Sequence, residues 1–141
     1  MPVSIHPPQG SIVIVDYRQG FKKPEMVKRR LAIVLSPKIE ERADLCAVVP
    51  LSTTEPKKIM PYRMKINIPF KIPESWGKLE RWVKGDMINT VGFHRIDLLR
   101  LGRDITGKRQ YQYRTLPATT FKNVRQCVLH GIGMPFLTKR L

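Results

Sequence analysis

Residues 25–37 read EMVKRRLAIVLSP, and residues 45–54 read LCAVVPLSTT. Each segment contains a short apolar run that stops at a proline or at small hydroxyl residues. Residues 10–17, GSIVIVDY, contain a similar run that comes after a glycine. Short runs rich in Val and Ile, bounded by turn-forming residues, are typical of buried strands. The three segments therefore predict the centre of a β-sheet. The predicted strands cover residues 12–17, 31–36 and 45–49.

Further short elements lie between the third strand and residue 109. Residues 62–68 alternate between apolar and polar side chains, which is typical of a half-buried strand with Met64 and Ile66 facing the core. Turn-forming and charged residues divide the segment from residue 69 to residue 109 into smaller pieces. The predicted pieces are a strand at residues 81–84, strands or turns at 89–100, and a hairpin or loose loop at 102–109.

The C-terminal part predicts one helix at residues 117–130. Phe121, Val124 and Val128 have helical spacing, and Gly131 stands at the stop position. Several short strands before one helix favour a mainly β fold, a small and strongly bent sheet or barrel with a C-terminal helix. We expect one domain over residues 1–141, beginning with an irregular, proline-containing segment at residues 1–9.

The hydropathy pattern argues against membrane insertion and secretion. The longest apolar runs are about five residues, whereas a helix needs roughly 20 to cross a bilayer. The first residues lack the basic, apolar and small-residue order of a signal peptide. We therefore expect a cytoplasmic protein without a membrane partner.

The cysteines and histidines predict neither a metal site nor a cofactor. Cys46 lies in an apolar strand and Cys127 in the predicted helix, so both are interpreted as buried thiols. The three histidines are scattered along the chain. Without a cluster at ligand spacing, the sequence gives no reason to expect bound metal.

The charge is the strongest signal in the composition. The chain has 26 Lys and Arg against 11 Asp and Glu, a formal net charge of +15. Such an excess favours an acidic partner, most commonly nucleic acid and otherwise an acidic protein. A basic surface that serves only solubility is the less favoured alternative.

The order of these motifs resembles the MazF/PemK family of toxins from bacterial toxin–antitoxin pairs. The shared features are a strand led by Gly10, a loop with Glu25, Arg30 at the start of the second strand, and a strand ending in Pro50 and Ser52. The resemblance covers roughly residues 10–86 by motif. It implies an SH3-like, CcdB-like barrel and a homodimer. It also implies cleavage of single-stranded RNA without metal, and neutralisation by a cognate acidic antitoxin.

The resemblance assigns roles to individual residues. RNA carries its own nucleophile, the 2′-hydroxyl, so the protein must move two protons and stabilise charge on the phosphate. Arg30 matches the family's catalytic arginine, whose planar fork suits phosphate. Glu25 matches the loop glutamate, as proton acceptor or as orienter of Arg30. Ser52 aligns with the hydroxyl that contacts the scissile phosphate, and Thr53 comes directly after it.

A second motif lies at residues 84–86. Lys84 and Asp86 resemble the Arg-x-Asp of some PemK-type members, in which the aspartate fits a proton acceptor. Lysine keeps the charge at that position but lacks the bidentate fork. The loop at residues 21–25, FKKPE, lacks the histidine of PemK-type members, and Leu31 replaces their proline. These departures leave two alternatives open: a non-catalytic binder of RNA or DNA, and a toxin with a protein target, as in related gyrase-poisoning toxins.

Basic residues around these motifs are candidates for binding the RNA backbone. They are Lys22, Lys23, Lys28, Arg29, Lys57, Lys58 and Arg63. For each lysine, a solvated face is an equal alternative. Tyr17, Phe21 and Trp82 are candidates for stacking on bases, although core packing is the more common role of such residues.

Overall fold

Three buried antiparallel strands form the centre of the sheet in this computed structural model, which describes residues 2–141. They are β1 (Ile12–Asp16), β2 (Arg29–Val34) and β3 (Leu45–Ser52). Their β-branched side chains pack well on a pleated surface that is covered on both sides. Met1, part of the N-terminal segment expected to be irregular, lies outside the described residues.

Strand β2 begins earlier than its apolar run. Arg29 pairs with Asp16 and Arg30 with Val15, so both arginines belong to the sheet. The backbone of a polar residue can continue the ladder when its side chain reaches solvent at the strand end. Arg30 is therefore held by the hydrogen-bonded backbone and does not hang from a loop.

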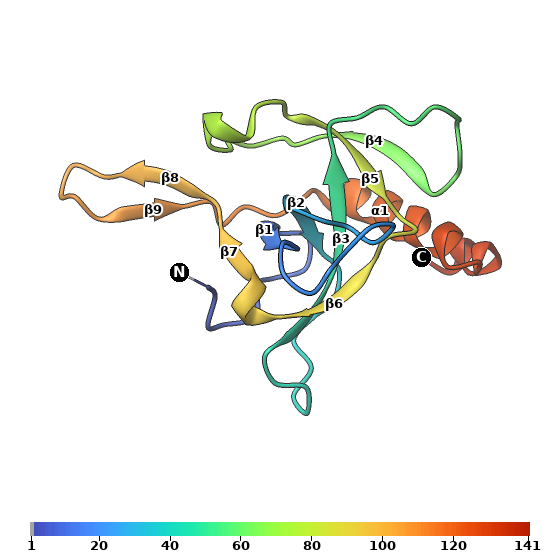
Figure 1. Cartoon of the computed structure of the whole chain (residues 1–141), viewed down its shortest axis with the longest axis horizontal. Coiled ribbons are helices and arrows are strands. Elements are labelled where there is room, and N and C mark those ends of the chain that lie inside the picture. The colour runs from blue at the N-terminus through green and yellow to red at the C-terminus, as the bar shows by residue number, and fades with distance from the viewer. Residues whose placement is uncertain (1) are drawn as a thin grey trace.

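Strand β3 joins the two parts of the bent sheet. Its first half pairs with β6 (Asn89–Gly92), and its end pairs with β5 (Glu80–Lys84). Strand β5 pairs in turn with β4 (Arg63–Asn67), and β1 pairs with β7 (Ile96–Leu98). The order β4-β5-β3-β2-β1-β7 results, with β6 beside β3. Figure 1 shows β3 running through the centre of the molecule.

The alternation of side chains along the central strands divides the core in two. Ile12, Leu31 and Leu51 face a larger cluster that includes β4, β5 and Val124 of helix α1 (Ala118–Gly131). The other face carries Val15, Ala32 and Val48, which pack against Tyr17 and Met26 in a smaller cluster. Each central strand is covered on both sides, as its continuous apolar character predicts.

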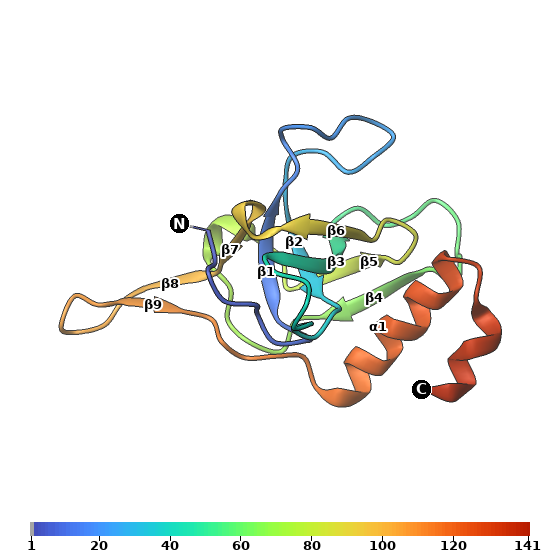
Figure 2. The same ribbon diagram turned by 90° about the horizontal axis from the view of Figure 1, so that it is seen from below.

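Helix α1 packs closely against the turn between β5 and β6. A Cβ atom at Gly85 would lie 2.6 Å from the Cys127 carbonyl oxygen, and one at Gly131 would lie 2.6 Å from the Asp86 nitrogen. Only glycine allows backbones to approach so closely. The helix observed at residues 118–131 therefore positions Asp86 from behind, with α1 beside β4 and β5 in Figure 2.

A two-stranded arm projects from the body of the protein. It consists of β8 (Arg100–Arg103) and β9 (Arg109–Tyr111), at the left of Figures 1 and 2. Its turn is closed by the Asp104 carboxylate, which accepts hydrogen bonds from the backbone nitrogens of Thr106 and Lys108 at 2.9 and 3.0 Å. Of the two predicted possibilities for residues 102–109, the hairpin is the one observed.

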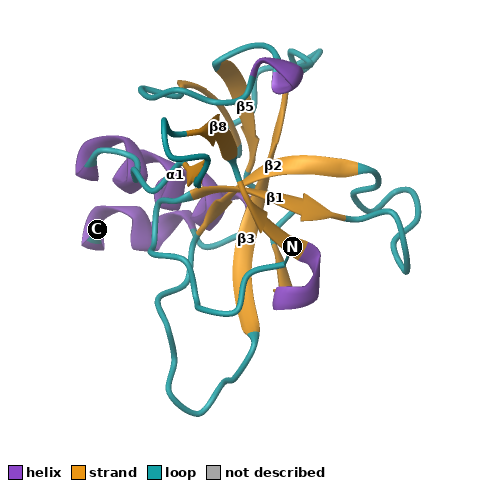
Figure 3. Cartoon of the chain, turned by 90° about the vertical axis from the view of Figure 1, so that its left-hand side faces the viewer, coloured by secondary structure: helices purple, strands orange, loops and turns teal. Residues whose placement is uncertain are grey.

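Within residues 2–141, three short helical turns accompany the strands and α1. They are η1 (Glu74–Trp76), η2 (Phe93–Arg95) and η3 (Pro135–Arg140). Figure 3 shows the C-terminal helical segments gathered on one side of the strands. Over residues 2–141, no helix is both long and apolar enough to cross a membrane.

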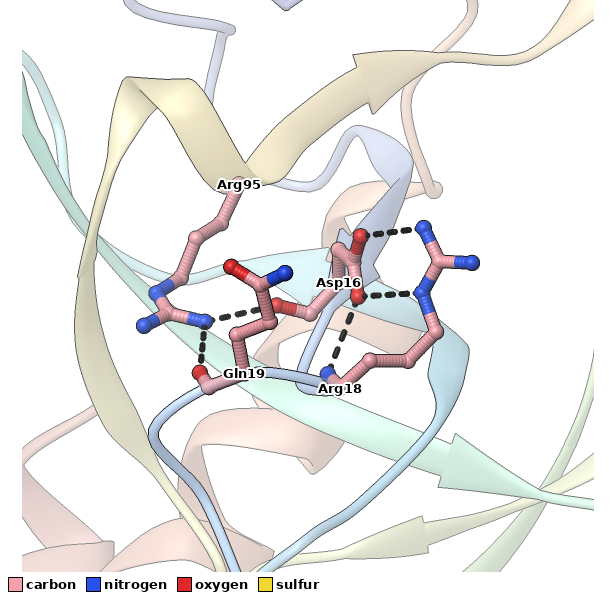
Figure 4. A network of polar contacts seen from close by, with 4 residues as sticks. All are labelled: Asp16, Arg18, Gln19 and Arg95. Carbon is pink, nitrogen blue, oxygen red and sulfur yellow. Dashed lines mark hydrogen bonds and ion pairs between the residues drawn. The ribbon is translucent and has the colours of Figure 1, made fainter.

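The β1–β2 loop is anchored at its base by a polar network (Figure 4). Arg95 donates through one terminal nitrogen to the carbonyl oxygens of Asp16 and Gln19, at 3.0 and 2.7 Å. The Asp16 carboxylate forms an ion pair with Arg18 at 2.7 Å. Arg18 holds the pKa of Asp16 down at about 2, below its ordinary 3.8. The network holds the first residues of the loop that carries Glu25.

Candidate active site

Arg30 and Ser52 lie on one face of the bent sheet. Arg30 shares the face of Ala32, because side chains alternate along a strand. Ala32 is paired with Pro50, and Ser52 lies two residues further on the same face as Pro50. Ser52 is buried, and its hydroxyl accepts a hydrogen bond from the Thr54 backbone nitrogen at 3.1 Å. The hydroxyl therefore shapes the chain just after β3.

The pairing of β4 and β5 extends this face. Ser52 is paired with Trp82, and Lys84 is paired with Arg63. Trp82 and Lys84 lie two residues apart and so share a face, opposite to the buried Val83. The register thus brings Lys84 and Arg63 to the face that carries Arg30 and Ser52.

Residues of this face, although not Arg30 itself, line a cavity of about 360 Å³, which we call the cleft. Its lining includes six of the candidate residues from the sequence together with Thr54 and Tyr62. The six are Ser52, Lys57, Lys58, Arg63, Trp82 and Lys84. Trp82 is half-buried in this lining. Its role in stacking on a base remains a prediction.

Arg30 is half-buried, and a hydrogen bond to the loop just before its strand sets the direction of its side chain. Its Nε donates to the Val27 carbonyl oxygen at 3.2 Å. Behind it lies the buried Tyr17, whose pKa is raised by burial, an effect that the positive charge of Arg30 opposes. Tyr17 packs edge-on against Phe21, with ring centroids 5.1 Å apart. Tyr17 is therefore a core residue, and it has no exposed face on which a base could stack.

Lys84 lies among other cations. Burial lowers its pKa, and the charges of Arg63 and Arg30 lower it further, while Asp86 acts in the opposite direction. Asp86 forms an ion pair with Arg63 at 3.0 Å, across the end of the β4–β5 hairpin. The four side chains form one electrostatic group with an excess of positive charge, suited to an anion such as phosphate.

Glu25 and Asp86 line a common cavity of about 250 Å³, which we call the carboxylate pocket. The Glu25 backbone nitrogen donates to the Lys22 carbonyl oxygen at 2.9 Å, and the neighbouring Met26 is buried. This anchoring places the loop glutamate beside the turn after β5. Because Asp86 also pairs with Arg63, the carboxylate pocket adjoins the cleft.

Some predicted residues lie away from the cleft lining. Lys22, Lys23 and Lys28 are exposed on the β1–β2 loop, and Thr53 is exposed after β3. Arg29 occupies the face of the sheet opposite to Arg30 and lines a different cavity. As RNA-binding residues, these five remain predictions.

Arg63 donates a hydrogen bond to the Asp86 carboxylate. The motif formed by Lys84 and Asp86 does not predict this contact. Tyr62, the residue before Arg63, lines the same cleft. The alternation over residues 62–68 puts Arg63 on the polar face of its strand, but only the hairpin register shows what it meets. Among residues 2–141, no three His, Cys, Asp or Glu side chains are grouped so as to hold a metal ion.

Comparison with known proteins identifies the family. The model of the PemK-like, MazF-like toxins of type II toxin–antitoxin systems matches residues 8–130. The chain belongs to the PemK/MazF toxin family. It is also 30% identical over 120 residues to the uncharacterised protein YifN of Escherichia coli K12, covering 83% of this chain and 75% of YifN.

Solved structures of MazF toxins have the same fold. MazF from Deinococcus radiodurans superposes with a TM-score of 0.61 at 20% identity, covering 92% of this chain and 99% of that one. A mycobacterial endoribonuclease in complex with its cognate antitoxin gives 0.56 at 16% identity, covering 92% and 97%. Because these sequence identities are low, the structural similarity shows a shared fold only. It confirms the predicted class of the PemK/MazF chain: a mostly antiparallel sheet with one C-terminal helix.

Proposed function

We propose that this PemK/MazF chain is a toxin endoribonuclease that cuts single-stranded RNA without metal. Family membership over residues 8–130 supports a toxin. A structural neighbour from a mycobacterial species is itself an endoribonuclease. The observation that carries the proposal is the convergence of Arg30, Lys84 and Arg63 on one face, beside a pocket with two carboxylates. Cations next to proton acceptors are what cleavage by a 2′-hydroxyl requires.

The proposed reaction is an internal transfer of the phosphate. The 2′-hydroxyl loses its proton to a carboxylate, Glu25 or Asp86, and its oxygen forms a bond to phosphorus. The bond from phosphorus to the 5′-oxygen breaks, and that oxygen takes a proton from Lys84. The products are a 2′,3′-cyclic phosphate and a 5′-hydroxyl. Arg30 stabilises the charge on the phosphate oxygens, because its fork donates two parallel hydrogen bonds.

The environment of Lys84 supports its role as proton donor. Burial and two neighbouring guanidinium groups lower its pKa. An amine whose pKa is closer to neutrality gives up its proton more readily than an ordinary lysine. Ser52, buried at the end of β3, holds the cleft lining in place and reaches the phosphate when RNA is bound.

The proposed partner is an acidic antitoxin. A net charge of +15 repels itself, and carboxylates of an antitoxin segment could occupy the positions of RNA phosphates. The mycobacterial neighbour was solved with its cognate antitoxin, and so was MazF of Deinococcus radiodurans with MazE. We further propose a cytoplasmic homodimer that inhibits growth when free and binds DNA together with its antitoxin.

A non-catalytic binder of nucleic acid is the second candidate. The ion pair between Arg63 and Asp86 favours it, because the Asp86 carboxylate is already engaged by a guanidinium and is less available to face a 2′-hydroxyl. Binding alone would need only the cations of the cleft.

One assay separates the candidates. The purified chain is incubated with EDTA and a mixed-sequence RNA, and the product ends are analysed. Discrete cuts that leave cyclic phosphates and 5′-hydroxyls support the toxin nuclease. A mobility shift without cuts supports the binder. If neither occurs while expression of the chain stops bacterial growth, a protein target such as gyrase becomes the better account.

A further inference from the structure

A second cavity lies on the opposite face of β2 from the cleft. It has a volume of about 510 Å³, and its lining includes Arg29, Trp76, Arg100, Arg103 and Tyr111. We call it the arm pocket, because β8 and β9 supply one wall. Figures 1 and 2 show the arm and the turn at residues 74–76 on the same side of the molecule, both away from α1.

Three guanidinium groups give the arm pocket its charge. Arg29, Arg100 and Arg103 are all exposed. The acidic residue of the arm is engaged elsewhere: the Asp104 carboxylate accepts hydrogen bonds within its own turn, from Thr106, Lys108 and Gln110. Asp97 is the carboxylate in the lining, against three arginines. The pocket therefore carries an excess of positive charge.

Two aromatic side chains add flat surfaces beside these charges. Trp76 is half-buried against the larger core cluster. Its turn is held by the buried Arg81, which donates to the Trp76 carbonyl oxygen and, at 2.8 Å, to the Lys78 carbonyl oxygen. Tyr111 lies on β9 and is also half-buried. Trp76 is held by the core cluster, and Tyr111 packs edge-on against Tyr113 with ring centroids 6.3 Å apart. Both rings could therefore receive a planar group with little loss of side-chain freedom.

We propose that the arm pocket is a second binding site for single-stranded RNA, which stacks a base on Trp76 or Tyr111 and places phosphates on the arginines. The inference rests on the proposed function, because RNA is the substrate assigned to the cleft. Arginine forks bind phosphate in pairs, and aromatic faces stack on any base. An acidic peptide would use the arginines but would leave the rings without a partner, so we favour RNA.

The two tryptophans of the chain make the proposal testable, because Trp82 lies in the cleft and Trp76 in the arm pocket. Trp82→Phe leaves Trp76 as the only indole reporter, and Trp76→Phe leaves Trp82. Each variant is titrated with a 2′-O-methyl RNA 12-mer, which carries the phosphates but has no 2′-hydroxyl to attack. We expect the fluorescence of Trp76 to change and to saturate.

A double variant tests the charges. In the Trp82→Phe background, Arg100→Ala with Arg103→Ala should weaken the affinity at least tenfold. It should also reduce the slope of log K against log salt by about 1.4, since each contact with a single strand contributes about 0.7. The charge-matched control, Lys122→Ala with Lys139→Ala, removes exposed cations of α1 and η3 and should leave affinity and slope unchanged. Circular dichroism checks that each variant is folded.

Each outcome decides the matter. If Trp82 responds to the RNA and Trp76 does not, the arm pocket is overturned while the proposed function stands. If the arginine variant binds like its control, the arm pocket is overturned as well. If neither tryptophan responds, the arm pocket is overturned, and the cleavage assay alone decides the proposed function. A poly-glutamate peptide that changes Trp76 fluorescence where the RNA does not would reassign the pocket to a protein partner.

Discussion

Arg29 and Arg30 are neighbours in the chain, yet they belong to two different sites. Arg30 lies on the face of the cleft, close enough to Lys84 for its charge to lower the pKa of that lysine. Arg29 lines the arm pocket on the other face. Strand alternation separates the two side chains although their Cα atoms are only about 3.8 Å apart. A run of basic residues in a sequence is therefore not one surface when it lies in a strand.

The two sites also differ in chemistry. The cleft adjoins a pocket with two carboxylates, Glu25 and Asp86, and it contains a lysine whose pKa is lowered. The arm pocket pairs exposed arginines with aromatic rings. The first set can move protons and stabilise developing charge, whereas the second can only bind. Catalysis and binding should therefore respond to different substitutions.

The largest expected effect comes from Arg30. Arg30→Ala should slow RNA cleavage on the order of 100- to 1,000-fold, as for the loss of one charge-stabilising donor. Arg30→Lys should rescue poorly, because the fork is lost. Cleavage is measured under single-turnover conditions with a fluorescent RNA in EDTA.

Arg29→Ala is the matched control, since it removes the same charge one residue away on the other face. It should weaken binding and leave the single-turnover rate at saturating protein nearly unchanged. Equal losses in the two alanine variants would show that the faces do not have separate roles. A fully active Arg30→Ala variant would remove Arg30 from the mechanism.

The second effect concerns the proton donor. If Lys84 must be protonated, the cleavage rate falls as pH rises through its pKa, which burial and two arginines place below the ordinary 10.5. Lys84→Arg keeps the charge but cannot release its proton, so the alkaline decline should disappear and the rate should drop about 100-fold. The measurement is a pH–rate profile of both proteins. An unchanged profile in the variant would assign the donor elsewhere.

The central strands and the helix could be predicted from the sequence, whereas the positions of Arg29 and Arg30 could not. The apolar runs predicted the central strands, and the spacing of Phe121, Val124 and Val128 predicted the helix, because local periodicity reflects burial directly. The sequence alone does not predict which face of the sheet Arg29 and Arg30 occupy. That prediction depends on β2 starting before its apolar run. Strand propensity does not predict that β2 begins at these arginines, because they join the strand through hydrogen bonds to β1.

Contacts between distant segments were harder still to predict. Arg63 meets Asp86 only because the β4–β5 hairpin pairs in one register, and Gly85 meets Gly131 only because α1 packs behind the turn. The arm pocket joins residues from β2, η1, β8 and β9. Nothing in the local pattern of residues 102–109 indicates what the hairpin would face.

The third effect is on stability. Gly131→Ala adds a Cβ 2.6 Å from the Asp86 nitrogen, so either α1 or the turn must shift, at a cost of about 1–3 kcal/mol. Urea unfolding measures the loss. Gly133→Ala is not a clean control because of its positive φ, so Thr119→Ala at the exposed start of α1 serves instead and should cost under about 0.5 kcal/mol. Equal stability of Gly131→Ala and the unsubstituted chain would contradict the close packing.

The smallest effect lies at the base of the loop that carries Glu25. Arg18 lowers the pKa of Asp16 from 3.8 to about 2, so the pair stabilises the fold above pH 3.8 and loses that contribution as pH falls through about 2. The pair is largely exposed and screened by solvent, so Arg18→Ala should lower the stability at pH 7 only slightly. Urea unfolding at pH 7 and at pH 2 should show this difference shrinking. A difference that persists at pH 2 would mean that Arg18 acts through packing.

The most direct test concerns the nucleophile, since the face around Arg30 is proposed to cut RNA by using the substrate's own 2′-hydroxyl. Once the cleavage site is mapped, two oligonucleotides are compared under single-turnover conditions in EDTA, one all-ribose and one with a single 2′-deoxy nucleotide before the scissile phosphate. We expect cleavage of the first to a cyclic phosphate, and no cleavage of the second at that bond although it binds equally well. Cleavage of the 2′-deoxy substrate at the same bond would contradict the proposed mechanism.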